Sequence, residues 1–293
     1  MTILVVGDRS MLAQELLPCL QQAGFVAIGH SRPALDITQV ASIEAVFEAV
    51  RPDICINTAA YTAVDKAESD TAAAFAVNRD GIARLAVTCR AAGTALVHLS
   101  TDYVFDGTAP RPYREEDAIA PLGIYGHSKW AGEEALRRFH QEHLIVRTAW
   151  LYGYHGTNFV KTMLRLAGER QVVQVVHDQH GCPTWTRDLA RALTVLCQRL
   201  TQARHACPWG TYHFCAAGQT TWYDFARAIF AQTRSPEALK IQRVEPIPTT
   251  AYPTPARLPA YYVLDCSKIH AALGISPRPW QDSLHDCMQE WPL

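Results

Sequence analysis

Short apolar runs alternate with longer amphipathic segments through the first half of the chain. The apolar runs predict strands at residues 2–6, 25–29, 53–57, 95–100 and 144–148, and the segments between them, such as 42–50 and 71–91, have helical patterns. Strands that alternate with helices form a parallel sheet with helices on both faces. The pattern therefore predicts an α/β fold with a doubly wound, Rossmann-like parallel sheet, whose ligands bind at the carboxyl ends of the strands.

The second half of the chain is less regular and richer in Pro, Trp and Tyr. Helical patterns at 158–170 and 221–232 are its clearest elements, and we interpret 172–176 and 187–199 as a return to the main sheet. Segment 251–257 is predicted to be a loop, because its prolines prevent a helix and remove backbone donors. We expect an NADP(H)-binding domain at 1–150, extended by about 171–200, and a smaller mixed α/β substrate domain formed by about 151–170 and 201–293.

Composition narrows the class of function. The 293 residues are 48% hydrophobic, which suffices for a full core, and 27 basic residues nearly balance 28 acidic ones. No global positive field therefore favours nucleic acid or an anionic membrane surface as a partner. No apolar run approaches the ~18 residues of a membrane span, and the N-terminus resembles no targeting signal. We expect a cytoplasmic monomer or homodimer with a small-molecule substrate.

The cysteines argue against a disulfide framework. Nine of them are scattered from Cys19 to Cys287 without a Cys-x-x-Cys motif, and most lie in apolar segments. This pattern favours reduced, buried thiols. Segment 177–182 contains two histidines and a cysteine but matches no recognised zinc spacing, so no metal site is predicted there.

The turn after the first predicted strand is the expected place for a pyrophosphate. Gly7 opens it, and Ser10, Met11 and Leu12 begin the next helix, where backbone N–H groups and the helix dipole attract anions. Only Gly7 remains of a Gly-x-x-Gly-x-x-Gly pattern. Ala13 is tolerated at the third position. Ser10 places a Cβ where backbone approaches a phosphate, and we hypothesise that its hydroxyl compensates by donating a hydrogen bond.

The turn after the second strand favours NADP(H) over NAD(H). The acidic residue that would bind a ribose 2′-hydroxyl is missing, and Ser31 and Arg32 stand there instead. A nearby Arg accommodates a 2′-phosphate, although these residues also suit an ordinary polar turn. Asp36 and Ile37 are expected to flank the adenine.

Small and polar residues follow the third and fourth strands. Because the carboxyl ends of parallel strands meet at one edge, we expect these residues to line the same site. They are Ala59, Ala60, Tyr61 and Thr62 after the third strand, and Ser100 and Thr101 at the end of the fourth.

Tyr125 and Lys129 form a Tyr-x-x-x-Lys pair. Four residues apart on a predicted helix, the two side chains share one face. A neighbouring ammonium group favours the ionised form of a phenol, so we expect Lys129 to lower the pKa of Tyr125 towards neutrality. Reduction of a carbonyl by hydride requires such a proton donor. The spacing also arises by chance on surface helices, so its context has to support it.

Several motifs provide that context. Ser-Thr-Asp-Tyr-Val-Phe stands at 100–105 and Tyr-Gly-His-Ser-Lys at 125–129, and further distinctive segments lie at 57–68, 147–150, 158–164, 178–184 and 252–257. Through them the chain resembles the extended short-chain dehydrogenase/reductases, and within these the dTDP-4-dehydrorhamnose reductase family, from residue 3 to about 280. The resemblance implies reduction of the C4 ketone of dTDP-4-dehydro-6-deoxy-L-mannose to dTDP-L-rhamnose, a precursor of cell-surface polysaccharide. NADPH would be the cofactor, with NADH as an alternative.

The same resemblance implies roles for individual residues. Tyr125 would donate a proton to the C4 oxygen, Lys129 would hold the nicotinamide ribose, and Thr101 would hydrogen-bond the reacting oxygen. The substrate would contact Thr62, Val64, Asp102, Tyr103 and Trp150 at its sugar, and Gln179, Pro183, Thr184 and Arg257 at its nucleotide.

Three departures from the family pattern leave alternatives open. Tyr261 and Tyr262 stand where the family usually has Asn-Ser, and Cys182 replaces a small apolar residue. A reductase of a different 4-keto sugar nucleotide and a non-catalytic, cofactor-binding regulatory homologue are therefore alternatives. A sugar-nucleotide dehydratase or epimerase is another, although Tyr103 stands where a dehydratase carries a Glu.

Some family members bind Mg²⁺ at a dimer contact through acidic residues. Glu15 matches one such position, and Asp188 lies near the other. Mg²⁺ prefers near-octahedral oxygen coordination. Two carboxylates alone do not predict such a site, so we expect no metal.

Overall fold

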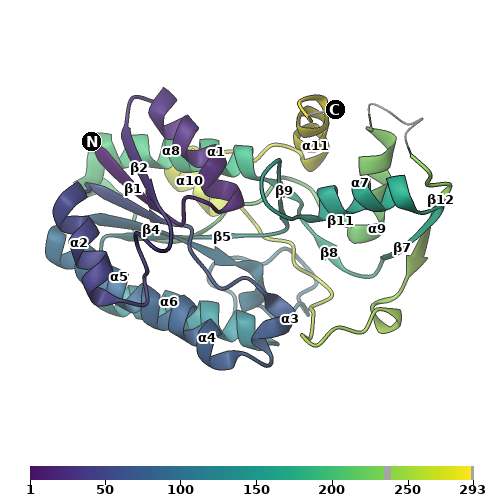
Figure 1. Cartoon of the computed structure of the whole chain (residues 1–293), viewed down its shortest axis with the longest axis horizontal. Helices are drawn as coiled ribbons and strands as arrows, with labels where there is room; N and C mark the ends of the chain where they lie inside the picture. The colour runs from purple at the N-terminus through teal and green to yellow at the C-terminus, as the bar shows by residue number, and fades with distance from the viewer. Residues whose placement is uncertain (234–238, 292–293) are drawn as a thin grey trace.

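The computed structural model describes residues 1–233 and 239–291 (Figure 1). The strands are β1 (Thr2–Val6), β2 (Val26–His30), β3 (Ile54–Asn57), β4 (Ala95–Thr101), β5 (His143–Thr148), β6 (Leu151–Tyr152), β7 (Val172–Val176), β8 (His180–Gly181), β9 (Thr184–Trp185), β10 (Gly210–His213), β11 (Thr220–Thr221) and β12 (Arg243–Ile247). The helices are α1 (Met11–Gln22), α2 (Val40–Val50), α3 (Val64–Ala67), α4 (Thr71–Phe75), α5 (Ile82–Ala92), α6 (Ile124–Phe139), α7 (Phe159–Glu169), α8 (Thr186–Ala203), α9 (Trp222–Ala231), α10 (Ser267–Leu273) and α11 (Trp280–Gln289).

A six-stranded sheet in the order β10-β5-β4-β3-β1-β2 forms the centre of the molecule. All of its neighbouring strands are parallel. The predicted α/β, Rossmann-like class is confirmed. The order of the strands reverses between β1 and β3, and ligands of such sheets bind in the crevice beyond the carboxyl ends at that point.

The side chains of β1 show why helices cover both faces of this sheet. Ile3 and Val5 pack in one cluster with α1, α8 and α10, whereas Leu4 and Val6 pack in another with α2 and α5. All four side chains are fully buried. Figure 1 shows the two groups of helices on opposite sides of the sheet. Strands buried on both faces have continuous apolar sequences, and this explains why the pattern located them.

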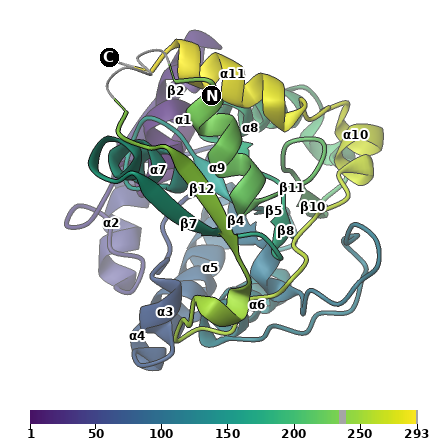
Figure 2. The same ribbon diagram turned by 90° about the vertical axis from the view of Figure 1, so that its right-hand side faces the viewer.

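An outer part of the chain is built on the parallel pair β7 and β12. Figure 2 shows these strands side by side, near α7 and α9. Val173 and Val175 are buried in a cluster with Val160 of α7 and Phe225 of α9. The interpretation of 172–176 as a strand of the main sheet is therefore wrong, because its apolar side chains pack against α7 and α9 instead.

Two later segments return to the main sheet, one as a helix that packs on its face and one as a strand. Residues 187–199 lie within α8, whose apolar side chains pack on the sheet together with those of α1. After α8 the chain adds β10 beside β5 as an edge strand. β10 has no clear signal in the sequence, because Gly-Thr-Tyr-His is short and lacks an apolar run.

The described residues bear on two expectations about composition. All nine cysteines are free, six of them are buried and Cys19, Cys207 and Cys266 are partly exposed, and the reduced state of the thiols stays a prediction. Between residues 1–233 and 239–291, no helix is both long enough and apolar enough for a membrane span.

Candidate active site

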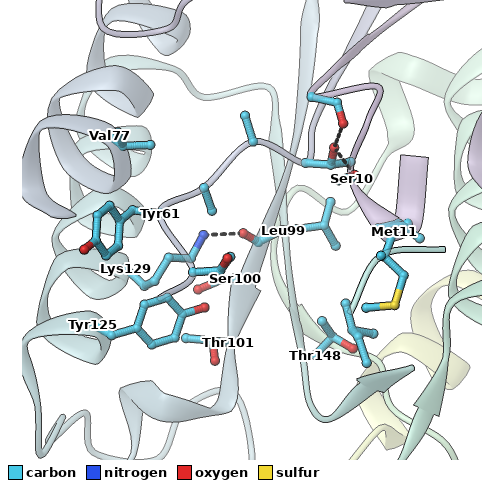
Figure 3. Close-up of a pocket in the computed structure, with 18 of the residues that line it drawn as sticks. Ser10, Met11, Tyr61, Val77, Leu99, Ser100, Thr101, Tyr125, Lys129 and Thr148 are labelled. Carbon is cyan, nitrogen blue, oxygen red and sulfur yellow. Dashed lines mark hydrogen bonds between the residues drawn. The ribbon is translucent and has the colours of Figure 1, made fainter. Parts of the chain in front are cut away.

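A cavity of about 870 Å³ lies beyond the carboxyl ends of the central strands, and Tyr125 and Lys129 of α6 form part of its wall (Figure 3). Its lining includes every residue that the sequence predicted for the cofactor: Gly7, Ser10, Met11, Leu12, Ser31, Arg32, Asp36, Ile37, Ala59, Ala60, Tyr61, Thr62, Ser100, Tyr125 and Lys129. The fold thus brings these residues to one place, and what they bind stays a prediction.

Gly7 allows the chain to turn sharply beside β3. Its φ is +86°, which favours glycine, and a Cβ there would lie 2.9 Å from the backbone nitrogen of Ala59. No side chain fits this approach. The close contact explains why Gly7 is present although the rest of the glycine pattern is not.

The hydroxyl of Ser10 has its hydrogen-bond partners within the protein. Its Oγ accepts from the backbone N–H of Ala13 at 3.0 Å, as the N-cap of α1, and lies 2.8 Å from the Oγ1 of Thr58. The Thr58 hydroxyl has two carbonyl acceptors, Val6 O at 2.8 Å and Gly7 O at 3.1 Å. Because a hydroxyl has one proton, Thr58 can donate to only one of these three oxygens. Donation from Ser10 to a phosphate stays a prediction.

Arg32 reaches over the mouth of the cavity from the turn after β2. Its side chain is 66% exposed, and its Nη2 lies 2.8 Å from the Oδ2 of Asp36. Although burial opposes it, hydrogen bonds from Arg32 and from Thr38 lower the pKa of Asp36. The guanidinium therefore has an anionic partner on one side, and most of its surface faces solvent.

The predicted helix at 71–91 is interrupted by a π-helical segment, Ala76–Gly81. Within it, the Oδ1 of Asn78 accepts from the N–H of Tyr61 at 2.9 Å, and its Nδ2 donates to the Tyr61 carbonyl at 3.0 Å and to the Oγ of Ser128 at 2.9 Å. These bonds connect the turn after β3 to α6, between Tyr125 and Lys129. Single π-turns are frequent at functional sites, and helical periodicity alone does not reveal them.

Tyr125 lies in the first turn of α6, with the Thr101 hydroxyl within hydrogen-bonding reach of its phenol (Figure 3). Burial, reinforced by the carboxyl of Asp102, raises the pKa of Tyr125 to about 12 despite the hydrogen bond with Thr101. The expectation that Lys129 lowers this pKa is wrong, because removal from water outweighs other influences. The phenol is therefore neutral near pH 7, the state in which it can donate a proton.

Lys129 is 2% exposed and donates from Nζ to the carbonyl of Leu99 at 2.6 Å (Figure 3). Burial lowers the pKa of Lys129 to about 8, although the nearby carboxylate of Glu133 acts in the opposite direction. The carbonyl therefore fixes the position of the amino group at the cavity wall, and the amino group exchanges its proton at mildly alkaline pH.

Asp102 adds a buried carboxyl near Tyr125. Its Oδ1 accepts from the Thr101 hydroxyl at 2.9 Å, and its Oδ2 has no hydrogen-bond partner among the described residues. Burial raises the pKa of Asp102 to about 7. Buried polar atoms normally have partners, so an unpaired oxygen at this cavity suits a hydrogen-bond donor of a ligand.

Aromatic side chains form part of the cavity lining at Tyr103, Tyr125 and Trp150, and further rings pack against them. The ring of Tyr103 meets the edge of Tyr125 at 5.5 Å and lies 5.2 Å from Tyr262, between centroids. Trp150 stacks on Trp222 at 3.5 Å, so one face of its indole is already covered. The φ of Trp150 is +46°, a conformation that non-glycine residues rarely adopt and that recurs at ligand sites.

The remaining predicted substrate residues divide into two groups. Thr62, Val64, Thr101, Asp102, Tyr103, Tyr125 and Trp150 line the cavity. Among the described residues around it, Gln179, Pro183, Thr184 and Arg257 lie outside the lining. Gln179 is buried against Thr249 and Trp222, Thr184 is fully buried with its hydroxyl donating to the Cys182 carbonyl, and Arg257 is exposed. Contacts of these four with a nucleotide stay predictions.

The two carboxylates considered for Mg²⁺, those of Glu15 and Asp188, form ion pairs with arginines. Arg187 donates to the Oε2 of Glu15 at 3.0 Å, and Asp188 lies 3.5 Å from Arg278 and accepts from Ser283. Within residues 1–233 and 239–291, no group of three or more His, Cys, Asp or Glu side chains could hold a metal ion. These ion pairs join α8 to α1 and to Arg278, which lies just before α11.

Eleven residues of the cavity lining were not predicted from the sequence, and Arg9, Thr58, Val77 and Thr148 are among them. The hydroxyl of Thr148 is buried without a partner among the described residues, like the Oδ2 of Asp102. Thr148 ends β5, so the same rule about carboxyl ends could have identified it. Val77 lies in the π-helical segment, which gave no signal in the sequence.

Comparison with known proteins gives consistent similarities along the whole chain. A family model, the RmlD substrate binding domain, matches residues 1–292. A dTDP-4-dehydrorhamnose reductase of Burkholderia thailandensis is 41% identical over 99% of both chains. A dTDP-4-keto-6-deoxy-D-glucose reductase of Streptomyces niveus is 41% identical over 99% of this chain and 96% of the relative. The crystal structure of a dTDP-4-dehydrorhamnose reductase of Bacillus anthracis in complex with NADP has a TM-score of 0.89, with 36% identity and 99% of each chain covered.

Proposed function

The chain belongs to the RmlD substrate binding domain family, and we propose that it reduces the C4 ketone of dTDP-4-dehydro-6-deoxy-L-mannose to dTDP-L-rhamnose with NADPH. One observation carries the proposal: a neutral, buried phenol, a hydroxyl and an amino group meet in the wall of a cavity that also contains the turn after β1. A proton donor beside a dinucleotide site is what the reduction of a ketone requires.

The residues present fit a dinucleotide. NADPH supplies the hydride when bound. Gly7 leaves room for close backbone approach, and the N–H groups of Met11 and Leu12 at the start of α1 would hold the pyrophosphate. Arg32 would bind the 2′-phosphate through its exposed guanidinium. Lys129 would hold the nicotinamide ribose.

Proton delivery falls to Tyr125. Its raised pKa keeps the O–H intact near pH 7, so the phenol gives a proton to the C4 oxygen as charge develops there. The Thr101 hydroxyl, beside this phenol, would turn from the Oδ1 of Asp102 to donate a hydrogen bond to the same oxygen. The unpaired Oδ2 of Asp102 would accept from a hydroxyl of the sugar.

We assign the binding of the substrate's dTDP group to the outer part of the chain, which would act as the substrate domain. Arg257 is exposed, and its forked donors suit a diphosphate. Pro183 and Thr184 are buried, as is Gln179, so these three would shape the loop that borders the nucleotide. The free face of Trp150, opposite Trp222, would pack against the hexose.

A second substrate is a real alternative. The Streptomyces niveus relative bears the name of a dTDP-4-keto-6-deoxy-D-glucose reductase at the same identity as the Burkholderia relative. Tyr262, which departs from the family pattern, lies against both Tyr103 and Trp150 at the sugar end of the cavity. A non-catalytic role is disfavoured, because Thr101, Tyr125 and Lys129 are all present and converge on the cavity.

The decisive experiment is incubation of the purified protein with each 4-keto sugar nucleotide and NADPH, with absorbance at the reduced-nicotinamide band followed over time. NMR of the product then identifies the sugar and its C4 configuration. We expect dTDP-L-rhamnose. Consumption of NADPH with only the 4-keto-6-deoxy-D-glucose nucleotide would support the second substrate, and no consumption with either would refute the proposal.

A further inference from the structure

His98 is a buried, titratable residue that the proposed chemistry does not use. It lies in β4, has no exposed surface, and precedes Leu99, whose carbonyl holds Lys129. Both nitrogens of its ring have polar neighbours. Nδ1 lies 3.1 Å from the Nδ2 of Asn57, and Nε2 lies 3.4 Å from the Nζ of Lys129.

The amide of Asn57 determines which nitrogen of His98 carries the proton. The Oδ1 of Asn57 accepts from the N–H of Ala59 at 3.3 Å, and its Nδ2 donates to the carbonyl of Ala59 at 3.2 Å. Reversing the amide would break both bonds, so Nδ2 is the atom that faces the imidazole. An amide NH₂ group only donates. The Nδ1 of His98 must therefore accept, and in the neutral ring the proton resides on Nε2.

This tautomer aims an N–H at Lys129. An ammonium group has three donors and no acceptor, so it would face another donor at His98. A neutral amine can donate to the Leu99 carbonyl at 2.6 Å and accept from the Nε2–H of His98, so both partners are satisfied. The local hydrogen bonds thus favour the amine more than burial alone would.

Other charged groups around the amino group act in both directions. Glu133, one turn further along α6, favours the ammonium form, but its carboxylate is shared by Arg147 and Arg137 and accepts from Ser100. His143 of β5 lies behind His98, and Tyr125 lies on the same helix as Lys129. Burial lowers the pKa of Lys129 to about 8, and burial together with Lys129 lowers that of His98.

We propose that His98 is a positioning residue for the reduction: its fixed Nε2–H keeps Lys129 between ammonium and amine, so that Lys129 returns a proton to Tyr125 after each turnover. This inference rests on the proposed function. When Tyr125 has given its proton to the product oxygen, an N–H bond of the Lys129 ammonium breaks and the phenol O–H bond forms again. The resulting amine is held by His98 and Leu99 until it takes a proton from water.

The tautomer can be measured directly, whether or not the protein proves to be a reductase. Long-range ¹H–¹⁵N correlation spectra of protein labelled with ¹⁵N-histidine distinguish the two neutral tautomers and the imidazolium. His98→Phe identifies the signal by its loss. We expect the Nε2–H tautomer from pH 5 to pH 9. An Nδ1–H tautomer, or an imidazolium that titrates in this range, would overturn the proposal.

The consequence for catalysis is a shift in the pH profile of kcat. His98→Phe removes the N–H that opposes the ammonium form of Lys129. The pH at which kcat for NADPH oxidation falls on the alkaline side (the alkaline limb) should therefore increase by about half a unit or more, and KM for the sugar nucleotide should stay within about twofold of the wild type. His143→Phe, a buried histidine of the adjacent strand, is the matched control and should leave the limb in place. A uniform loss of kcat in His98→Phe with an unmoved limb would mean that His98 is merely structural.

A second variant covers a failure of His98→Phe to fold. Asn57→Asp offers a carboxylate oxygen to Nδ1, so the proton moves to Nδ1 and the Nε2 lone pair faces Lys129. The alkaline limb should again move to higher pH, and the histidine spectrum should change to the other tautomer. If the tautomer changed while the alkaline fall of kcat stayed at the same pH, the tautomer would not control Lys129, and the catalytic role of His98 would be rejected.

Discussion

Glu133 and Arg147 form a buried, two-pronged ion pair directly beneath the candidate active site. The Nη2 of Arg147 lies 2.7 Å from Oε2 of Glu133, its Nε lies 2.9 Å from Oε1, and their side chains are 1% and 0% exposed. Ser100 also donates to this carboxylate, at 2.5 Å. The pair therefore joins β5, β4 and α6, the helix that carries Tyr125 and Lys129.

Arg147→Met tests the importance of this pair for stability. The substitution removes the fully buried ion-pair partner of Glu133 and leaves it with Ser100 and the half-buried Arg137 as donors. We expect the free energy of unfolding to fall by about 3–5 kcal/mol, the usual cost of breaking a buried pair. Urea unfolding at pH 7 measures it. The control is Arg79→Ala, which removes an exposed pair with Asp80 and should cost less than about 1 kcal/mol.

Tyr125→Phe tests the assignment of the proton donor. The variant keeps the ring and removes only the hydroxyl, so kcat for NADPH oxidation should fall by about 100-fold or more, the contribution of a positioned general acid. Binding of NADPH, followed by fluorescence, should change little. Tyr252→Phe, at an exposed tyrosine, should behave like the wild type. Near-normal turnover of Tyr125→Phe would remove Tyr125 from the mechanism.

Arg32→Ala tests the preference for NADPH. The guanidinium is exposed and lies beside Asp36 at the mouth of the cavity. Its loss should reduce kcat/KM for NADPH by about tenfold, which corresponds to ~1.4 kcal/mol, and leave that for NADH within about twofold. Arg165→Ala, in another exposed i,i+4 pair, serves as the control. If both cofactors lost the same factor, Arg32 would not be the 2′-phosphate ligand.

Asp102 should make stability depend on pH. Burial raises its pKa in the folded state to about 7, from 3.8. The folded protein then holds this proton more tightly than the unfolded chain, so the stabilisation is complete below about pH 4 and is lost as the pH rises through 7. Asp102→Asn cannot ionise, and relative to the wild type it should gain stability as the pH rises over this range.

The shift in the pKa of Asp102 sets an upper limit to the stability that Asp102→Asn can gain. A difference of about 3 pKa units corresponds to no more than about 4 kcal/mol. Urea unfolding of the wild type and of Asp102→Asn at pH 5, 6, 7 and 8 measures it. The exposed variant Glu48→Gln is the control and should show no such trend. A constant difference between Asp102→Asn and the wild type at all four values would show that Asp102 does not titrate in this range.

Much of the candidate site could be predicted because parallel sheets collect the ends of their strands at one edge. Gly7, Ser31, Ala59 and Ser100 lie at or just beyond the carboxyl ends of four different strands and line one cavity. The π-helical segment was beyond prediction, because Asn78 takes its partners from Tyr61 and Ser128, which are far from it in the sequence. The hydroxyl of Ser10 likewise has a hydrogen-bond partner, Thr58, that lies 48 residues away in the sequence.

The sequence by itself determined the first five strands of the central sheet, the alternation of helices with them and the Tyr125 and Lys129 pair, because continuous apolar strands and helical spacing are local properties of the chain. Only the tertiary structure decided that β7 pairs with β12 rather than with the main sheet, since strand pairing depends on long-range packing. It also decided the protonation of Tyr125, because its pKa depends on burial and on the approach of Asp102 and Thr101. Desolvation and hydrogen bonding act through distances in space, which residue spacing does not encode.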